Sequence, residues 1–506
     1  MISSVKKQFI KNIFSGWFAQ LSATVVGVVM LPYNLHHLGK DLYAIHVLAV
    51  SLVAMLQWIN LGMGPALLRF FAQAMAQNDL REIGRLSSTA QVVLGSLGLF
   101  GAGLLTLAIP VFLRVYEVLP EFHRDTTILM VLMAGTFFLN FHNIVFTNMI
   151  LANQRYDLVK LRQVVSHWLQ LGLLVALYNV FTPSLIWLGT ALFAGTLYQY
   201  AATVFLCRSR WGRVVFFSRK NVAFGRLPEF FSFSLLTLIN STFFSLSIQV
   251  PLLIIGKTLG KESVALLAPA VLISTFLCST LAHLCDSLTP LAAKDHAING
   301  GKNLGRWALL FGQIVACCSY ACLFGAVLFM PDVLRLWLGE DFVAISNVVT
   351  IFAAGAVFGS IQLATNNLAL GAGSMAPFAF SSVVMALAII LGVFIGTAFL
   401  HWGLLGVVTS MACIRIIRNT FYITWKYSQP FGYSLRNYFA GVYGKPLLGG
   451  LTAFAFILLV RPWLPEPHGL VTTAGEIAAY GVVYALGTWF LGISPETKNV
   501  ILSIRR

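Results

Sequence analysis

Apolar residues run through this chain in long, nearly uninterrupted stretches separated by short polar segments. Each stretch is about 20 residues long, enough for an α-helix to cross the ~30 Å hydrocarbon core of a bilayer. The pattern predicts an all-α polytopic membrane protein with about 14 transmembrane helices, and two weak breaks leave thirteen or fifteen open. The predicted spans are 12–33, 42–60, 87–109, 126–147, 160–180, 184–206, 229–255, 263–285, 307–330, 343–366, 376–400, 403–425, 443–463 and 470–492.

Composition supports this interpretation. The 506 residues are 58% hydrophobic and 10% charged, with a mean hydropathy of +0.83, which excludes a soluble globular protein. A net charge of +16 would suggest nucleic-acid binding in a soluble chain, but here little aqueous surface exists to carry a basic patch. With the N-terminus in the cytoplasm, 26 of the 33 basic residues fall on the cytoplasmic side. This bias predicts an N-in, C-in topology, with no nucleic-acid partner.

Several function classes are disfavoured. The longest connections are about 20 residues, too short for a soluble catalytic or nucleotide-binding domain. Gly256-Lys257-Thr258 resembles the end of a phosphate-binding loop, but Pro251 stands where its first glycine belongs. Most of the seven cysteines lie inside spans without the spacing of a metal or disulfide framework. We therefore expect neither ATP hydrolysis nor a metal or other cofactor.

The chain matches itself at an offset of 221 residues. Three separated segments align, at equivalent ends of equivalent spans: Leu38-Gly39-Lys40-Asp41 with Leu259-Gly260-Lys261-Glu262, Gly84-Arg85 with Gly305-Arg306, and Leu113-Arg114 with Leu334-Arg335. The repeat predicts two six-helix lobes, 1–228 and 229–426, followed by helices 13 and 14 in 427–506. Because each lobe has an even number of spans, both enter the membrane from the same side. Twin lobes of this kind favour a carrier that works by alternating access.

Neutral polar side chains recur at helical spacing inside several spans. They form stripes in the fourth span (Thr136, Asn140, Asn143, Thr147), the tenth (Gly355, Gly359, Gln362, Asn366), the fifth (Gln163, His167, Gln170) and the seventh (Thr237, Asn240, Ser241). Amides and hydroxyls suit the hydroxyl groups of sugars, but they equally hold helices together. Both interpretations stay open from the sequence. The candidate substrate-binding amides are Asn140, Asn143, Gln362, Asn366 and Asn240.

Charged residues inside spans are rarer. Arg415 and Arg418 lie in the second half of the twelfth span, either as anchors whose side chains snorkel to the interface or as partners of an anionic group such as a pyrophosphate. Arg69 is a further candidate at the inner mouth. No carboxylate lies in the middle of a span, and Glu476 sits near an outer end. The remaining candidates for ion coupling are therefore His142 and His167.

Short motifs carry a family resemblance. They are Leu38-Gly39-Lys40-Asp41, Asn60-Leu61-Gly62-Met63-Gly64-Pro65-Ala66, Arg69-Phe70-Phe71-Ala72, Leu336-Trp337-Leu338-Gly339 with Phe342, and Trp402-Gly403-Leu404-Leu405-Gly406. Together they resemble bacterial polysaccharide flippases, the O-antigen and lipopolysaccharide-biosynthesis transporters of the multidrug/oligosaccharidyl-lipid/polysaccharide exporter (MOP) superfamily. Asn60 departs from the pattern, which usually has Asp there.

The resemblance implies a transporter of the bacterial inner membrane. It would move an undecaprenyl-pyrophosphate-linked oligosaccharide from the cytoplasmic to the periplasmic leaflet, with basic residues meeting the pyrophosphate and amides meeting the sugars. Helices 13 and 14 would offer a lipid-facing groove for the polyprenyl tail, and a polysaccharide polymerase and other assembly proteins would be partners.

Three alternatives stay open, and one of them is a purely structural scaffold for a biosynthetic complex. An ion-coupled multidrug antiporter of the same superfamily is disfavoured by the two extra helices and by the lack of a mid-span acid. A membrane-embedded glycan-processing enzyme would need acidic catalytic residues near the outer face. There the sequence offers only Glu117, Glu121, Asp332, Glu340 and Asp341, interpreted as ordinary solvated loop charges.

Overall fold

We describe a computed structural model of the chain. It covers residues 2–60, 62–212, 217–223, 225, 235–285, 287–463 and 469–503, with side chains described between 15 and 499. Seven basic residues in the charge count (Lys6, Lys7, Lys11, Arg213, Arg226, Arg505 and Arg506) and also Asp286 lie outside the described residues or side chains. The chain divides into two compact units, residues 1–265 (unit 1) and 266–506 (unit 2).

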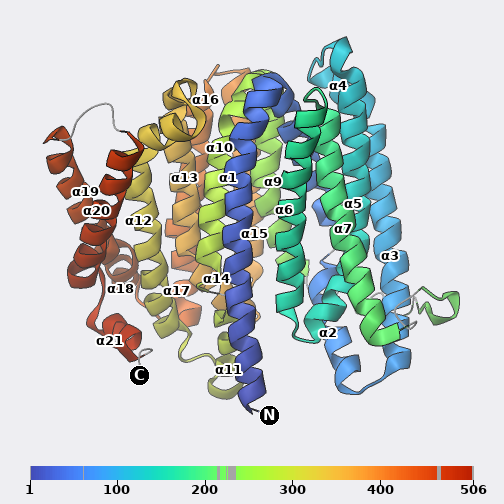
Figure 1. The fold of residues 1–506 in the computed structure, drawn as a ribbon. Coiled ribbons are helices and arrows are strands. Elements are labelled where there is room, and N and C mark those ends of the chain that lie inside the picture. Colours follow the sequence, from blue (N-terminus) through green and yellow to red (C-terminus); the bar gives the residue numbers. More distant parts are fainter. Residues whose placement is uncertain are drawn as a thin grey trace. The chain divides into compact units, whose positions relative to one another are not determined.

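Unit 1 is helical throughout its regular elements. These are α1 (Ile2–Met55), η1 (Leu56–Asn60), α2 (Met63–Ala76), α3 (Leu80–Leu107), α4 (Ile109–Val115), η2 (Pro120–Phe122), α5 (His123–Ala152), α6 (Tyr156–Val180), α7 (Leu185–Trp211), η4 (Arg219–Asn221) and α9 (Leu235–Thr258). Figure 1 shows α3, α5 and α7 side by side. Helix α5 packs against α2, α3 and α7, and its buried face carries Phe137, Phe141 and Val145. This packing fixes which side chains of α5 are left for a cavity.

Close approach between α3 and α5 depends on a glycine. A Cβ at Gly101 would lie 2.2 Å from Cε1 of Phe137, so no other residue fits there without a shift. The aromatic ring therefore packs directly on the α3 backbone. Since interiors are close-packed, the position leaves no room for adjustment.

Unit 2 begins at Leu266, within α10 (Lys261–Ala282). Its further elements are α11 (Leu288–Asn299), α12 (Leu304–Leu338), η6 (Glu340–Ile345), α13 (Ser346–Ile361), α14 (Leu363–Gly371), α15 (Ala376–Ala398), α16 (Leu404–Ile416), the π-helical η7 (Ile417–Ile423), α17 (Thr424–Phe431), α18 (Leu435–Tyr438), the π-helical η8 (Phe439–Gly444), α19 (Lys445–Val460), η9 (Arg461–Trp463), α20 (Leu470–Gly487), the π-helical η10 (Thr488–Gly492) and α21 (Pro495–Ser503).

The last two long helices of unit 2 are tied to α12, beside which they lie in Figure 1. Two tyrosines of α20, one turn apart, donate to backbone carbonyls of α12: Tyr480 to Ala321 at 2.7 Å and Tyr484 to Cys317 at 2.5 Å. In a bilayer core no water can satisfy these hydroxyl groups, so such bonds fix the register of the two helices. The C-terminal helices are thus an integral part of unit 2.

The model confirms the predicted class, an all-α polytopic membrane protein. Twelve helices in the described part of the chain are long and apolar enough to cross a membrane. One of them, Ser15–Asn60, covers two predicted spans and bends at Gly39, where φ is 74°. The predicted span 160–180 coincides with α6, a 25-residue helix that is not among the twelve. The number fourteen and the positions of the termini stay predictions.

The internal repeat is visible in the backbone. Gly39 and Gly260, which align at the offset of 221, both have a positive φ, 74° and 89°. Residues close to the two glycines are also in contact: the Lys40 ammonium lies 3.4 Å from the Glu262 carboxylate. The predicted division into 1–228, 229–426 and 427–506 is drawn by counting helices, whereas units 1 and 2 are defined by their compactness. The predicted boundaries at 228 and 426 are therefore not tested and stay a prediction.

Candidate functional site

A polar cavity of about 390 Å³ lies within unit 1 between η1, α2, α5 and α9. Its polar side chains are all uncharged amides and hydroxyls: Asn60, Asn140, Asn143, Thr147, Asn148, Thr237 and Ser241. Gly62, Gly64, Pro65, Ile144 and Leu238 complete the lining. The volume falls in the range of small-molecule sites, and several convergent polar groups are the usual sign of one.

The amide of Asn143 is the most informative group in this cavity. Asn143 is only 9% exposed, and its Oδ1 has no hydrogen-bond partner among the described residues. A buried acceptor without a partner costs roughly 1–3 kcal/mol, so such groups usually have a partner that is not part of the protein. Asn143 thus contributes its amide to the cavity lining, but Oδ1 itself is buried, and a ligand hydroxyl would reach it only after the amide rotates.

The turn between η1 and α2 shapes another wall. The Gly62 amide N–H donates to Oδ1 of Asn60 at 2.9 Å, and Gly62 has a φ of 69°, a conformation that favours glycine. An aspartate oxygen at position 60 could accept the same bond. Asn60 therefore closes this turn with an uncharged side chain.

A second cavity of about 230 Å³ adjoins the first. It shares Asn60, Leu238 and Ser241 with it and extends along α9 to Thr242 and Ser245. Its polar side chains are again uncharged, since Gln57, Asn60 and three hydroxyls supply them. We call the two together the neutral cavity.

Of the predicted stripes, the fourth span contributes Asn140, Asn143 and Thr147 to the neutral cavity, and the seventh contributes Thr237 and Ser241. Asn240 lies on α9 but does not line it. Arg69 is exposed on α2, away from the lining. The neutral cavity is therefore lined by residues close in sequence to Asn240 and Arg69, but not by these two candidates themselves.

The two histidines also lie off the neutral cavity. Nδ1 of His142 is 2.9 Å from the Tyr200 hydroxyl, and the ring packs edge-on against Phe146. His167 is half-buried on α6, and its Nδ1 has no hydrogen-bond partner among the described residues. His142 is thus bound up in the packing of α5 on α7, and a coupling role for either residue stays a prediction.

In unit 2 the predicted amides have different surroundings. Nε2 of Gln362 donates to the Thr424 hydroxyl at 2.9 Å and to the Tyr443 hydroxyl at 3.0 Å. Gln362 is buried in a core that also holds Tyr438 and Tyr443, residues near the start of the thirteenth predicted span. Asn366 is half-buried on α14. The Nε2 group of Gln362 therefore binds helices together, whereas its buried Oε1 has no hydrogen-bond partner among the described residues.

Both candidate arginines are buried, at 5% exposure for Arg415 and 9% for Arg418. Arg415 lies near the middle of the apolar helical stretch Leu404–Phe431, and its depth in a membrane stays a prediction. Both side chains are enclosed by neighbouring helices, and their role as substrate partners or as anchors stays a prediction. The Arg415 guanidinium lies 5.4 Å from the centre of the Phe352 ring on α13.

The N–H groups of Arg418 donate hydrogen bonds to other groups of the protein. Its Nε donates to the Ser381 hydroxyl at 3.0 Å, and its Nη2 donates to Ser382 at 2.8 Å and to the Phe378 carbonyl at 3.3 Å. Nη1 donates to Asn419. This set of bonds joins α15 to η7, which is a structural task.

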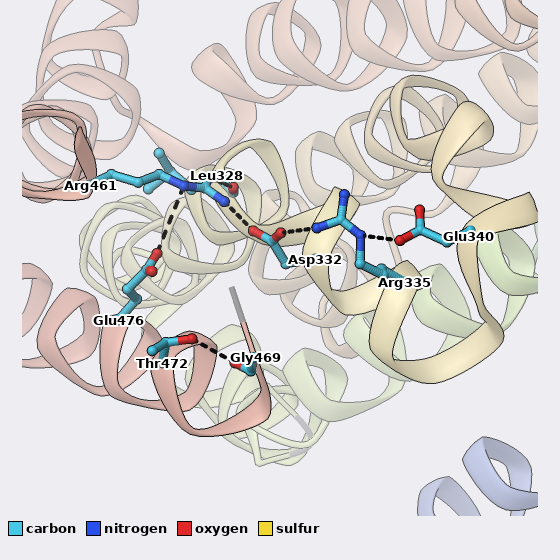
Figure 2. Close-up of polar contacts among 8 residues, drawn as sticks. All are labelled: Leu328, Asp332, Arg335, Glu340, Arg461, Gly469, Thr472 and Glu476. Carbon is cyan, nitrogen blue, oxygen red and sulfur yellow. Dashed lines mark hydrogen bonds and ion pairs between the residues drawn. The ribbon is translucent and has the colours of Figure 1, made fainter. Parts of the chain in front are cut away.

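A charged network in unit 2 corrects the interpretation of Asp332 as a solvated loop charge, whereas Glu117, Glu121, Glu340 and Asp341 are exposed as predicted. Asp332 of α12 is 3% exposed and pairs with both Arg461 of η9 and Arg335. Arg461 also lies 3.9 Å from Glu476 of α20, and Arg335 lies 2.9 Å from Glu340 (Figure 2). Buried carboxylates are stable only when paired in this way. Asp332 and Glu476 therefore anchor the C-terminal helices.

Sequence reasoning missed some lining residues. Asn148 directly follows Thr147, so it falls off the stripe, yet it lines the cavity and its Nδ2 donates to the Ile144 carbonyl. Gly62 and Gly64 present backbone, for which a polar stripe gives no signal. Asn60 stood in a recognised motif, and its amide could have been counted as a lining candidate.

Comparison with known structures gives the fold. The lipid II flippase MurJ in an inward closed conformation matches with a TM-score of 0.73 at 12% identity, over 95% of this chain and 98% of its own. An inward-facing multidrug resistance MATE family transporter of the MOP superfamily matches with 0.66 at 14% identity, over 84% and 98%. A MOP superfamily transporter from Pyrococcus furiosus matches with 0.59 at 15% identity, over 84% and 95%.

The chain therefore has the fold of MOP-superfamily transporters. At these identities the likeness is one of fold alone. No protein family model and no curated protein sequence matches the chain.

Proposed function

We propose that the protein is a flippase that moves a polyprenyl-pyrophosphate-linked oligosaccharide from the cytoplasmic to the periplasmic leaflet of the bacterial inner membrane. The observation that carries this proposal is the neutral cavity, whose polar side chains are amides and hydroxyls. Such groups both donate and accept, as sugar hydroxyls do. In our proposal Asn143 accepts a hydrogen bond from the glycan.

The lining also bears on the alternative. An antiporter of cationic drugs would be expected to offer a carboxylate to the substrate or the coupling ion. None of the described residues that line the neutral cavity is an acid, and Asn60 stands where the family pattern has one. Similarity to the MurJ lipid II flippase over 95% of the chain, against 84% for the MATE transporter, supports the same choice.

For the anionic part of the substrate the proposal retains Arg415. It is buried near the middle of a span, a position that is costly unless it serves a function. Arg418 is assigned a supporting role, because four protein groups already accept its hydrogen bonds. The apolar outer surface of α19 and α20, with Leu448, Leu459 and Val482 exposed, is assigned to the polyprenyl chain.

Reconstitution tests the proposal. The purified protein is placed in vesicles with a fluorescent polyprenyl-pyrophosphate oligosaccharide in one leaflet, and a membrane-impermeant glycosidase reports its arrival in the other. We expect transfer to be faster than in protein-free vesicles. Absence of transfer, together with proton exchange driven by cationic drugs, would support the antiporter instead.

A further inference from the structure

Unit 1 contains a separate cavity of about 250 Å³ where α5 ends, α6 begins and α7 ends. It shares no residue with the neutral cavity. Its lining combines two arginines, an indole and apolar side chains: Ile150, Asn153, Arg155, Leu158, Leu206, Ser209, Arg210 and Trp211. The charge pattern of the sequence predicts that this end of the helices lies on the cytoplasmic side.

The turn before α6 positions the first arginine. Gln154 adopts a φ of 57°, which is uncommon for a residue other than glycine, and the chain then reverses into α6. Arg155 forms a bidentate pair with the buried Asp157, through Nε at 2.9 Å and Nη2 at 3.2 Å. Two of its five N–H donors are used in this way, and the pair holds the guanidinium at the cavity wall.

The second arginine is held in a similar manner. With the Asn153 amide oriented so that its oxygen faces α7, Nε and Nη2 of Arg210 both donate to that oxygen at 2.9 Å. The guanidinium also lies 5.8 Å from the centre of the Trp211 ring. Arg210 thus keeps its remaining N–H donors for another partner, and it carries a full charge that no carboxylate neutralises among its described contacts.

We propose that this cavity binds a phosphate group at the cytoplasmic membrane surface. Two guanidinium groups held in place are the arrangement that recognises phosphate oxygens. The apolar side chains of Ile150, Leu158 and Leu206 suit the hydrocarbon next to a lipid headgroup. An anionic phospholipid and a soluble pyrophosphate share this chemistry, and the experiment separates them.

Native mass spectrometry of the full-length protein in detergent tests the site. Phosphatidylglycerol, zwitterionic phosphatidylcholine and inorganic pyrophosphate are titrated separately. Two variants are compared with the natural chain: R210Q removes the charge, and S209W fills the cavity while both arginines stay. Ser209 and Arg210 are exposed, so both variants should fold. The matched control is R81Q/R85Q, which removes two exposed arginines of α3 from the side predicted to be the same.

We expect phosphatidylglycerol to bind at least about tenfold more weakly to R210Q and S209W, with the control unchanged. Loss of pyrophosphate binding alone would assign the same site to a soluble phosphate. Equal affinities for both ligands in the natural chain and the two cavity variants would overturn the proposal. An equal loss in R81Q/R85Q would overturn it too, because binding would then reflect general surface charge.

Discussion

Asp332 of α12 and Arg461 of η9 form an ion pair in which the carboxylate is almost fully buried. The two residues are far apart in the chain, and the pair joins the ninth predicted span to the end of the thirteenth. Arg461 also donates to the Leu328 carbonyl at 2.7 Å (Figure 2). The C-terminal helices are therefore held to α12 by charge as well as by tyrosine hydroxyls.

Replacing Arg461 with Gln should destabilise unit 2 by about 3 kcal/mol, because it leaves Asp332 and Glu476 buried with less positive charge nearby. Thermal unfolding in detergent, followed by intrinsic fluorescence, measures the effect. Lys257→Gln, which breaks the exposed pair with Glu117, is the control and should change stability by less than about 1 kcal/mol. If both variants lower the unfolding temperature by the same amount, the buried network contributes no more to stability than an exposed ion pair, which contradicts this prediction.

Gln362→Leu should lower stability by roughly 1–2 kcal/mol, because the hydroxyl groups of Thr424 and Tyr443 lose the donor that they share. Translocation per folded molecule should stay within about twofold of the natural chain. The exposed Gln429 on α17 offers the control, Gln429→Leu. A large loss of translocation at unchanged stability would instead assign Gln362 to the substrate.

Arg418→Lys should fail to replace the arginine, since a single ammonium cannot reproduce the planar fork that reaches Ser381, Ser382 and the Phe378 carbonyl. We expect a loss of about 2 kcal/mol in stability. The exposed Arg436, changed to Lys, should leave the unfolding temperature unaltered. An unaltered unfolding temperature for Arg418→Lys as well would remove the structural assignment.

Asp295, near the end of α11, should make stability depend on pH. Hydrogen bonds from the Asn299 and Asn303 side chains, at 2.8 and 2.7 Å, lower the pKa of this carboxyl group. Because the pKa is lowered on folding, the contribution is present above the pKa of the unfolded chain and is lost as pH falls through the pKa of the folded chain.

Asp295→Asn should therefore unfold more readily than the natural chain at neutral pH, and the difference should shrink on acidification. Unfolding temperatures measured from pH 7 downward show this. The exposed Glu121, changed to Gln, supplies the reference. A difference that stays constant with pH would mean that the carboxylate charge has no part in this loop.

The sequence predicts the fold class well because long apolar stretches dictate helices in a bilayer. It also predicts three of the four polar side chains that α5 contributes to the cavity, since Asn140, Asn143 and Thr147 repeat at helical spacing. Helical spacing also selects Gln362, but spacing alone does not distinguish a side chain that lines a cavity from one that binds a neighbouring helix. The difference depends on Tyr443, which approaches from a distant part of the chain.

Burial of charge is equally hidden from the sequence. Asp332 follows an apolar span as a solvated loop residue would, and only the approach of Arg461 makes it a buried partner. Arg155 and Arg210 count in the sequence as two of many cytoplasmic charges. Their meeting in one cavity follows from the packing of α6 beside α7, which no local pattern encodes.

The central claim is that Asn143 meets the glycan of a lipid-linked substrate, and the translocation rate of Asn143→Leu in vesicles tests it most directly. Asn179→Leu, which changes an exposed asparagine on α6, is the matched control. Since Oδ1 of Asn143 has no partner among the described residues, leucine should leave the unfolding temperature unchanged or higher. We predict a rate at least about tenfold below that of the natural chain and of Asn179→Leu. A rate equal to that of the control, with both variants folded, would contradict the account.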